Sequence, residues 1–326
     1  MTKRSVSNST KERTAHVRAV HPQTDVDGAL AIILTNAQMR WLNRVGAASA
    51  GQIEGVHELR VGLRRLRSAL TLMRDYIPPK QRSGLDAELK WLLGALAPVR
   101  DLDVFIHEHL HAMSLAGSRR PAKEQAKETE ALTLLKTAAH QARTAAQRRA
   151  RAALISMRHR RLVQRVSAWI LAHEWRVGRI PRSRFSAKIG KIAQRILNAR
   201  LSRIHKQGRR IHKRSAQELH DLRISIKKVR YGLGFFKGAL PLKTQKRARK
   251  LLRILTDLQS ALGHLNDTAM AEHIVAMLVR RTAGADARRK VAKAGARIIA
   301  RLKKTATDAR SGIAPRWKAL KSFGTI

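Results

Sequence analysis

Residues 57–67 read HELRVGLRRLR, and residues 220–230 read HDLRISIKKVR. The offset between the two copies is constant, and each position is matched in chemical type except Gly62, which aligns with Ser225. A repeated hydrophobic core requires only that the leucines recur. In this chain a histidine and four basic residues recur with them. The motif therefore predicts a shared, strongly negative ligand as well as shared packing.

The repeat extends beyond this motif. At the same offset, Arg40 matches Arg203 and Pro78 matches Pro241. At a slightly longer offset, LAPVRD (96–101) matches LGHLND (262–267). A chain of 326 residues is long enough for two core-forming units. We therefore expect a disordered basic N-terminal tail over residues 1–24, a first helical repeat over 25–176 and a second over 183–321.

Helical periodicity dominates the chain, and runs of alternating β-branched and aromatic residues, which indicate strands, are absent from the sequence. In the first half we predict helices over residues 27–46, 53–76, 80–96, 101–116, 122–157 and 159–175. In the second half we predict them over 183–210, 216–238, 242–262, 267–282, 285–308 and 316–321. The predicted fold is all-α, with two tandem four-helix bundles related by a pseudo-two-fold axis.

The charge of the chain predicts a polyanionic partner. Lys and Arg total 68 against 22 acidic residues, which gives a formal net charge of +46. So many like charges repel one another in a compact fold. The sequence has no cysteine, which excludes disulfides, thiol catalysis and cysteine-based zinc sites. No uncharged apolar run is long enough to span a bilayer, so we expect no membrane partner and a cytoplasmic location. The oligomeric state is left open.

The repeated helix presents two adjoining stripes on a wheel of about 100° per residue. The apolar stripe consists of Leu59, Leu63, Leu66 and Leu70 in the first copy and Leu222, Ile226, Val229 and Leu233 in the second. The cationic stripe consists of His57, Arg60, Arg64 and Arg67 in the first copy and His220, Arg223, Lys227 and Arg230 in the second. Arg65 and Lys228 lie away from both stripes and, with Arg40 and Arg203, are predicted to flank a site.

The cationic stripes are better explained as a phosphate-binding face than as a face exposed only to solvent. Like charges three and four residues apart destabilise a helix, and Glu58 and Asp221 lie too far round to neutralise them. Arginine can engage two phosphate oxygens with its planar fork, and lysine offers a point charge. Histidine near dense negative charge takes up a proton and donates from either ring nitrogen. We therefore predict that the two stripes converge on one groove that binds a polyanion.

The motif His57-x-x-Arg60-x-x-x-Arg64-Arg65-x-Arg67, its second copy ending in Arg230-Tyr231, and the segment Leu96…Arg100-Asp101-x-Asp103 resemble the CHAD family, the conserved histidine α-helical domains. The resemblance covers about residues 25–320. It implies two four-helix bundles around a basic central groove that binds inorganic polyphosphate, in a protein associated with polyphosphate granules. Some members are fused to a CYTH triphosphatase domain, whose alternating glutamates this sequence lacks. In the second copy Asn266-Asp267 replaces the Arg-Asp pair.

Candidate catalytic signals are weak. His107, Glu108 and His111 form a His-Glu-x-x-His pattern, but a bundle helix gives a protease no cleft and no third ligand stands out. Hydrolysis of phosphoanhydrides needs clustered carboxylates for a metal ion. Asp101 and Asp267 stand just before predicted helices, where a cap role is favoured. We therefore expect no enzymatic activity, no catalytic residue, no metal and no cofactor.

The function predicted from sequence is polyphosphate binding. A nucleic-acid-binding protein that uses the same groove is the main alternative, because any phosphate backbone would release counterions on binding this charge. Aromatic residues make up only 4% of the chain, which leaves few platforms for stacking bases. A metal-dependent polyphosphate hydrolase is the less favoured alternative.

Overall fold

The structure is a computed structural model in which residues 18–114 and 122–326 are described. Within these two ranges the chain is helical, and no strand forms. The only β-type pairing there is an isolated antiparallel bridge between Asp25 and Lys188. The predicted all-α class is confirmed.

The first half contains α1 (Val26–Leu42), α2 (Val45–Ser49), α3 (Ile53–Leu72), α4 (Pro79–Val104), α5 (His111–Ser114), α6 (Ala122–Ile155) and α7 (Met157–Leu171), with the 3-10 turns η1 (Arg74–Tyr76) and η3 (Glu174–Arg176) and the π-helical turn η2 (Phe105–Leu110). The second half contains α8 (Ser183–Ser186), α9 (Ile189–Gln207), α10 (Ala216–Phe235), α11 (Leu242–Arg281), α12 (Ala285–Ser311) and α13 (Ile313–Lys321), with the 3-10 turn η4 (Ile211–Lys213).

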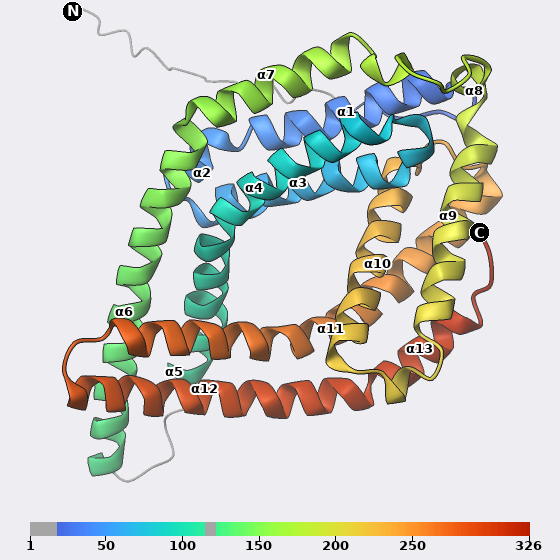
Figure 1. Cartoon of the computed structure of the whole chain (residues 1–326). Coiled ribbons are helices and arrows are strands. Elements are labelled where there is room, and N and C mark those ends of the chain that lie inside the picture. Colours follow the sequence, from blue (N-terminus) through green and yellow to red (C-terminus); the bar gives the residue numbers. More distant parts are fainter. Residues whose placement is uncertain (1–17, 115–121) are drawn as a thin grey trace, which may run out of the picture.

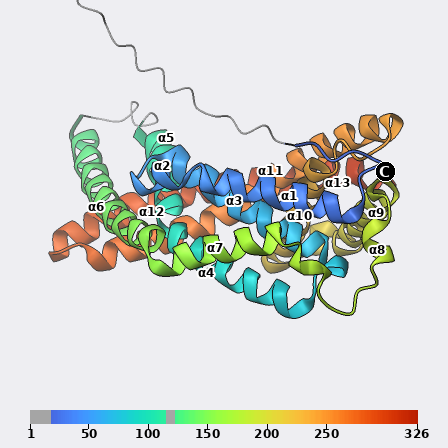
Figure 2. The same ribbon diagram turned by 90° about the horizontal axis from the view of Figure 1, so that it is seen from above.

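The helices are arranged as a four-sided frame (Figure 1). α1, α3, α7 and the first part of α4 run along one side, and α6 with the end of α4 along the next. The second part of α11 runs with α12 along the third side, and α9, α10 and the first part of α11 lie along the fourth. Seen from above, the frame is shallow (Figure 2). Two contacts close it, one between α3 and α10 and the other between α6 and α12. The two halves therefore share packing surfaces.

The starts of the main helices follow the sequence repeat. α1, α3 and α4 begin at Val26, Ile53 and Pro79, and α9, α10 and α11 begin at Ile189, Ala216 and Leu242. Each pair is separated by the same offset as the repeated motif. The prolines act alike in both copies, since Pro78 and Pro241 each stand at the N-cap, immediately before α4 and α11. A proline there loses no helical hydrogen bond, because the first amide groups of a helix have no partner within it.

Two predicted helix breaks are wrong. α4 continues through Pro98, and α11 runs without interruption from 242 to 281. Proline removes one helical hydrogen bond, but burial of the apolar face around it, including Leu96 and Val99 at 0% exposure, outweighs that loss. Asp101 and Asp267 consequently lie inside helices and do not cap them.

The predicted apolar stripes are buried, as expected. Leu59 and Leu63 on α3 and Leu222 and Ile226 on α10 are each 0% exposed. These residues anchor each helix in its half, which fixes the direction of the neighbouring cationic stripe.

The predicted disordered tail covers residues 1–24, of which 1–17 lie outside the described part. Residues 18–24 contact the rest of the chain: the Asn36 side-chain amide donates to the Arg18 carbonyl at 2.8 Å, and the Ile189 amide donates to the Thr24 carbonyl at 2.9 Å. Val20 is 3% exposed. This segment therefore joins α1 to the second half.

The one mismatch in the repeated motif has a steric cause. A Cβ atom added at Gly62 would lie 2.7 Å from the backbone nitrogen of Trp41 on α1. Since real Cβ contacts are not this short, α1 and α3 can approach this closely only with glycine at position 62. The second copy carries Ser225 at the equivalent position.

We predict that Gly62→Ser, which introduces the residue of the second copy, destabilises the protein. Overpacking of this kind costs about 1–3 kcal/mol, and the free energy of unfolding can be measured by denaturant titration. Gly94→Ala is the matched control, because Gly94 is also helical and an added Cβ there meets nothing within 4 Å. It should stabilise by about 0.5–1 kcal/mol. Unchanged stability of Gly62→Ser would contradict the close approach of α1 and α3.

Candidate functional site

The cationic stripes of α3 and α10 meet at Lys227. Burial, followed by the positive charges of Arg223, Arg64, Arg230 and Arg60 in that order, lowers the pKa of Lys227 to about 7. Arg64 and Arg60 belong to α3, whereas Arg223 and Arg230 belong to α10. The structure thus brings cations from both halves into one site, which we call the central cationic site: Arg60, Arg64, Arg223, Lys227 and Arg230.

Arg60 is the most deeply placed cation of this site. It is 6% exposed, and its Nη1 donates to the carbonyl of Leu93 on α4 at 2.9 Å. Burial, with a smaller contribution from the charge of Arg64, lowers the pKa of Arg60 to about 10. The hydrogen bond to α4 holds this side chain in place, so that it contributes positive charge from a buried position.

The charge of the central cationic site is incompletely compensated. The buried Nε atoms of Arg60, Arg223 and Arg230 have no hydrogen-bond partner. Buried polar atoms in folded proteins nearly always have one. Unpaired donors in a region of low dielectric make the local potential more positive. The arrangement is suited to an anion and is unfavourable without one.

The two copies differ at the far end of the stripe. Arg67 forms an ion pair with Asp86, with Nε 2.6 Å from Oδ1. Its counterpart Arg230 donates instead to the neutral amide oxygen of Gln259 at 2.8 Å. The predicted site residue Arg67 is therefore neutralised in part by α4, whereas the hydrogen-bond partner of Arg230 carries no charge.

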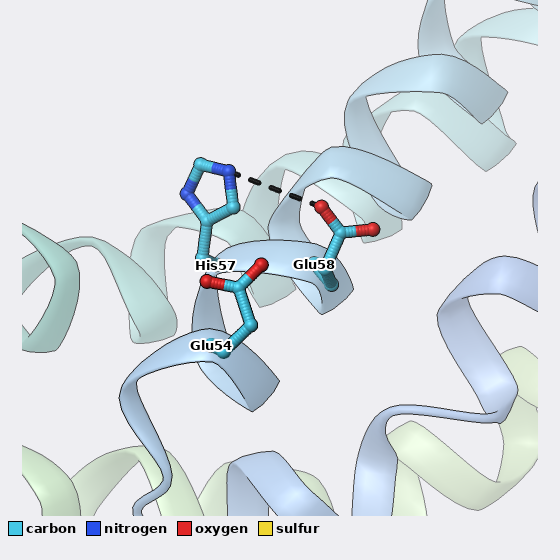
Figure 3. A group of neighbouring side chains, drawn as sticks. All are labelled: Glu54, His57 and Glu58. Atoms are coloured by element: carbon cyan, nitrogen blue, oxygen red, sulfur yellow. Dashed lines mark ion pairs between the residues drawn. The ribbon is translucent and has the colours of Figure 1, made fainter.

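His57 lies beside carboxylates (Figure 3). Glu54, His57 and Glu58 offer ligand atoms that all lie within 4.8 Å of one another, close enough to hold a divalent metal ion. No metal ligand is expected from the sequence, but the Glu-x-x-His-Glu spacing places all three side chains on one helical face. His57 Nε2 is 3.9 Å from Glu58 Oε1. The second copy has Gln217 in place of Glu54.

The two predicted histidines occupy matching positions without a bond between them. His57 lies near the start of α3 and His220 near the start of α10, and both are partly buried. No hydrogen bond or ion pair that the described residues form joins the two side chains to each other. They remain candidates for the margins of the site.

Two aspartates were missed as parts of the site. Burial raises the pKa of Asp101 above its ordinary value, although Arg60 and Arg64 nearby act to lower it. Asp267 behaves in the same way, with Arg223 among the charges that oppose the rise. Both were interpreted as helix caps because the helix breaks before them were misplaced. The sequence feature that points to both aspartates is the repeated segment that ends in Asp101 at residues 96–101 and in Asp267 at residues 262–267.

Two of the predicted flank residues, Arg65 and Lys228, lie where the halves meet. The Arg65 guanidinium lies 4.9 Å from the ring centroid of Phe235 on α10 and 5.8 Å from that of Tyr231. Cation–π contacts of this type stabilise by about 0.5–2 kcal/mol. Lys228, its counterpart, lies close to Arg67 and Asp86 of the first half. Arg65 and Lys228 therefore reach toward the opposite half, whereas Arg40 pairs with Glu58 of its own half at 3.4 Å.

The His-Glu-x-x-His pattern does not form a zinc-protease site in this structure. His107 and Glu108 lie on the π-helical turn η2, and His111 follows it at the start of α5. His107, His111 and His140 line a cavity of about 530 Å³ between η2 and α6. Over residues 18–114 and 122–326, the group with three ligand atoms close enough for a metal is the Glu54 group described above.

None of the helices in the described ranges combines the length and the hydropathy needed to cross a membrane.

Replacing Lys227 with methionine should stabilise the free protein. A lysine whose pKa falls from 10.5 to about 7 on folding is unfavourable when charged, and this penalty is complete below pH 7. Between pH 7 and about 10.5 the unfolded state binds more protons, so the penalty shrinks as pH rises. We expect Lys227→Met to melt several degrees higher at pH 6.5, with a smaller gain at pH 10. A lower melting temperature at both pH values would show that Lys227 is not held against repulsion.

Comparisons with known proteins agree with this architecture. Residues 32–276 match the family model of the CHAD domain. The crystal structure of the CHAD domain from the plant Ricinus communis is similar with a TM-score of 0.76 at 25% identity, covering 94% of this chain and 96% of that one. PptA from Streptomyces chartreusis shares the fold with a TM-score of 0.64 at 17% identity, covering 90% and 100%. A search of curated proteins gave no match. The family match spans most of the sequence, and the chain belongs to the CHAD domain family.

Proposed function

We propose that the protein binds inorganic polyphosphate in the central cationic site. The observation that carries this proposal is the meeting of cations from α3 and α10 at Lys227, whose pKa is lowered to about 7 by burial and by four neighbouring arginines. Such a group is costly to the free protein, and strongly perturbed titratable groups are found preferentially at functional sites. A polyanion would neutralise all of these cations at once.

The depth of the cations favours a thin anion. Arg60 is 6% exposed, and the Nε atoms of Arg223 and Arg230 are buried. A flexible phosphate chain can follow two converging helices and reach such groups. A DNA duplex is wide and rigid, and it would contact mainly cations that project from the surface. The small number of aromatic residues gives single strands few stacking platforms.

We propose further that the protein binds without hydrolysing its ligand and that it associates with polyphosphate granules in the cytoplasm. Hydrolysis would need carboxylates free to hold a metal ion. Asp103 is 1% exposed and forms an ion pair with Arg143 at 2.6 Å. Glu58, which belongs to the group that could hold a metal ion, also forms an ion pair with Arg40 at 3.4 Å. Binding to granules would follow if the central cationic site accepts an internal stretch of a long chain.

The double variant Arg64→Gln/Lys227→Gln should bind long-chain polyphosphate at least about 100-fold more weakly, since two charge-assisted hydrogen bonds contribute roughly 1.5–3 kcal/mol each. Arg148→Gln/Arg149→Gln is the matched control, because it removes the same charge from exposed positions of α6. Calorimetry at physiological salt measures both, and circular dichroism checks that both stay helical. Equal weakening in the two variants would remove the central cationic site from the proposal.

The same titration separates the alternative functions. Duplex DNA that binds more tightly per phosphate than polyphosphate would overturn the proposed ligand. Release of phosphate from polyphosphate with Mg²⁺ or Mn²⁺ would overturn the proposal that the protein is not an enzyme.

Polyphosphate binding should take up a proton at pH 8. The bound anion favours charged Lys227, whose pKa is about 7 in the free protein beside Arg223, Arg64, Arg230 and Arg60. Affinity should therefore fall as pH rises from 7 to 9. Calorimetry in two buffers of different ionisation enthalpy measures the uptake, and Lys227→Met should reduce it by roughly 0.9 proton, because about a tenth of this lysine is already charged in the free protein at pH 8. Identical uptake by the variant would assign the linkage to another group.

A further inference from the structure

A second cationic cavity lies at the junction of the two halves. Its volume is about 340 Å³, and it lies between the segment before α1, α1 itself, α3 and the end of α10. Four cations line it: Arg18, Arg40, Arg65 and Lys237. None of its lining residues is acidic. We call it the junction cavity.

The junction cavity is distinct from the central cationic site. Arg65 follows Arg64 on α3 and therefore projects about 100° away from it. Stacking on Phe235, at 4.9 Å from the ring centroid, fixes the guanidinium at the cavity wall. Glu58, 3.4 Å from Arg40 and 3.9 Å from His57, lies between the cavity and the margin of the α3 stripe. The two groups of cations can therefore act independently.

The cations of the junction cavity recur in the second copy. At the offset of the repeated motif, Arg40, Arg65 and Lys237 correspond to Arg203, Lys228 and Arg74. The second set is also a spatial cluster. Burial and then the charges of Arg200 and Arg203 lower the pKa of Lys228, and burial and then Arg74 and Arg203 lower the pKa of Arg200. A cluster of cations at this position is thus a feature of both copies of the repeat and not a chance gathering of surface charge.

The two clusters differ in their counter-charges. In the second cluster Arg74 Nε lies 3.5 Å from Asp75 Oδ1, and the equivalent of this aspartate in the first cluster is Gly238. Glu58, 3.4 Å from Arg40, offsets one of the four cations of the junction cavity. Both clusters keep an excess of positive charge, but none of the residues lining the junction cavity is acidic, and Lys237 lacks the neighbouring carboxylate that its counterpart Arg74 has.

We propose that the junction cavity is a separate anion site that binds a triphosphate group. Four cations around a cavity near the lower end of the size range of ligand pockets suit a short, highly charged anion and not a long chain. Ile33 and Val20 on its wall give apolar contact to one side of such a ligand. Tripolyphosphate and the triphosphate of a nucleotide share this chemistry. The site lies outside the proposed polyphosphate groove and does not depend on it.

The test is calorimetric titration of the full chain with tripolyphosphate and, separately, with ATP. Lys237→Glu is the principal variant, because Lys237 is exposed and its loss leaves the Arg65–Phe235 stacking in place. Arg74→Glu is the matched control at the equivalent position of the second cluster. We expect Lys237→Glu to weaken tripolyphosphate binding at least about 10-fold, the scale of one charge-assisted hydrogen bond, and Arg74→Glu to leave it within about 2-fold. Tighter binding of ATP than of tripolyphosphate would identify the nucleotide as the source.

Arg64→Gln/Lys227→Gln separates this site from the proposed function. It should keep one tripolyphosphate site per chain while losing long-chain binding. Unchanged tripolyphosphate binding by Lys237→Glu, equal loss in Arg74→Glu, or loss of the short ligand in Arg64→Gln/Lys227→Gln would each overturn the junction cavity as a triphosphate site.

Discussion

Mutual repulsion among the cations where α3 meets α10 is the constraint that the rest of this fold has to overcome. Lys227 lies among four arginines, and its pKa of about 7 reflects burial first and repulsion second. What holds these groups together is apolar: each cationic stripe adjoins a row of residues such as Leu63 and Ile226 that are 0% exposed. Burial of one such side chain stabilises by about 1.5–3 kcal/mol. The core can therefore hold in place a charge arrangement that is unfavourable in itself.

Duplication explains how one short motif produces a site of this density. α3 and α10 begin at equivalent positions of the repeat and contact each other, so every cation of one stripe has an equivalent across the contact. The long helices α4 and α11 then extend the two halves, and α6 packs against both α4 and α12. A single copy would carry one stripe on one face. Two copies in contact enclose the charge, which lowers the local dielectric and strengthens attraction to an anion.

The sequence predicted what local periodicity determines. The stripes of α3 and α10 follow from helical spacing, and the burial of Leu59 and Leu222 agrees with it. It did not predict that α4 passes through Pro98, because that depends on packing along the whole helix. Asp101 was misinterpreted for the same reason. Nor did it predict the contact of Arg65 with Phe235, since residues so distant in the sequence meet only through the docking of the halves.

The differences between the copies show which charges the fold neutralises by itself. Arg67 has Asp86 where Arg230 has a neutral glutamine, and Arg74 has Asp75 where Lys237 has Gly238. Helix packing alone does not require a carboxylate beside one cation and none beside its counterpart, because both cations of each pair lie at equivalent positions of the repeat. A carboxylate stabilises the free protein at each such position but competes with an incoming anion. Positions without one are less stable in isolation and more attractive to phosphate, and they occur at both the central cationic site and the junction cavity. Uncompensated charge, more than total charge, therefore distinguishes the two sites that we propose bind anions.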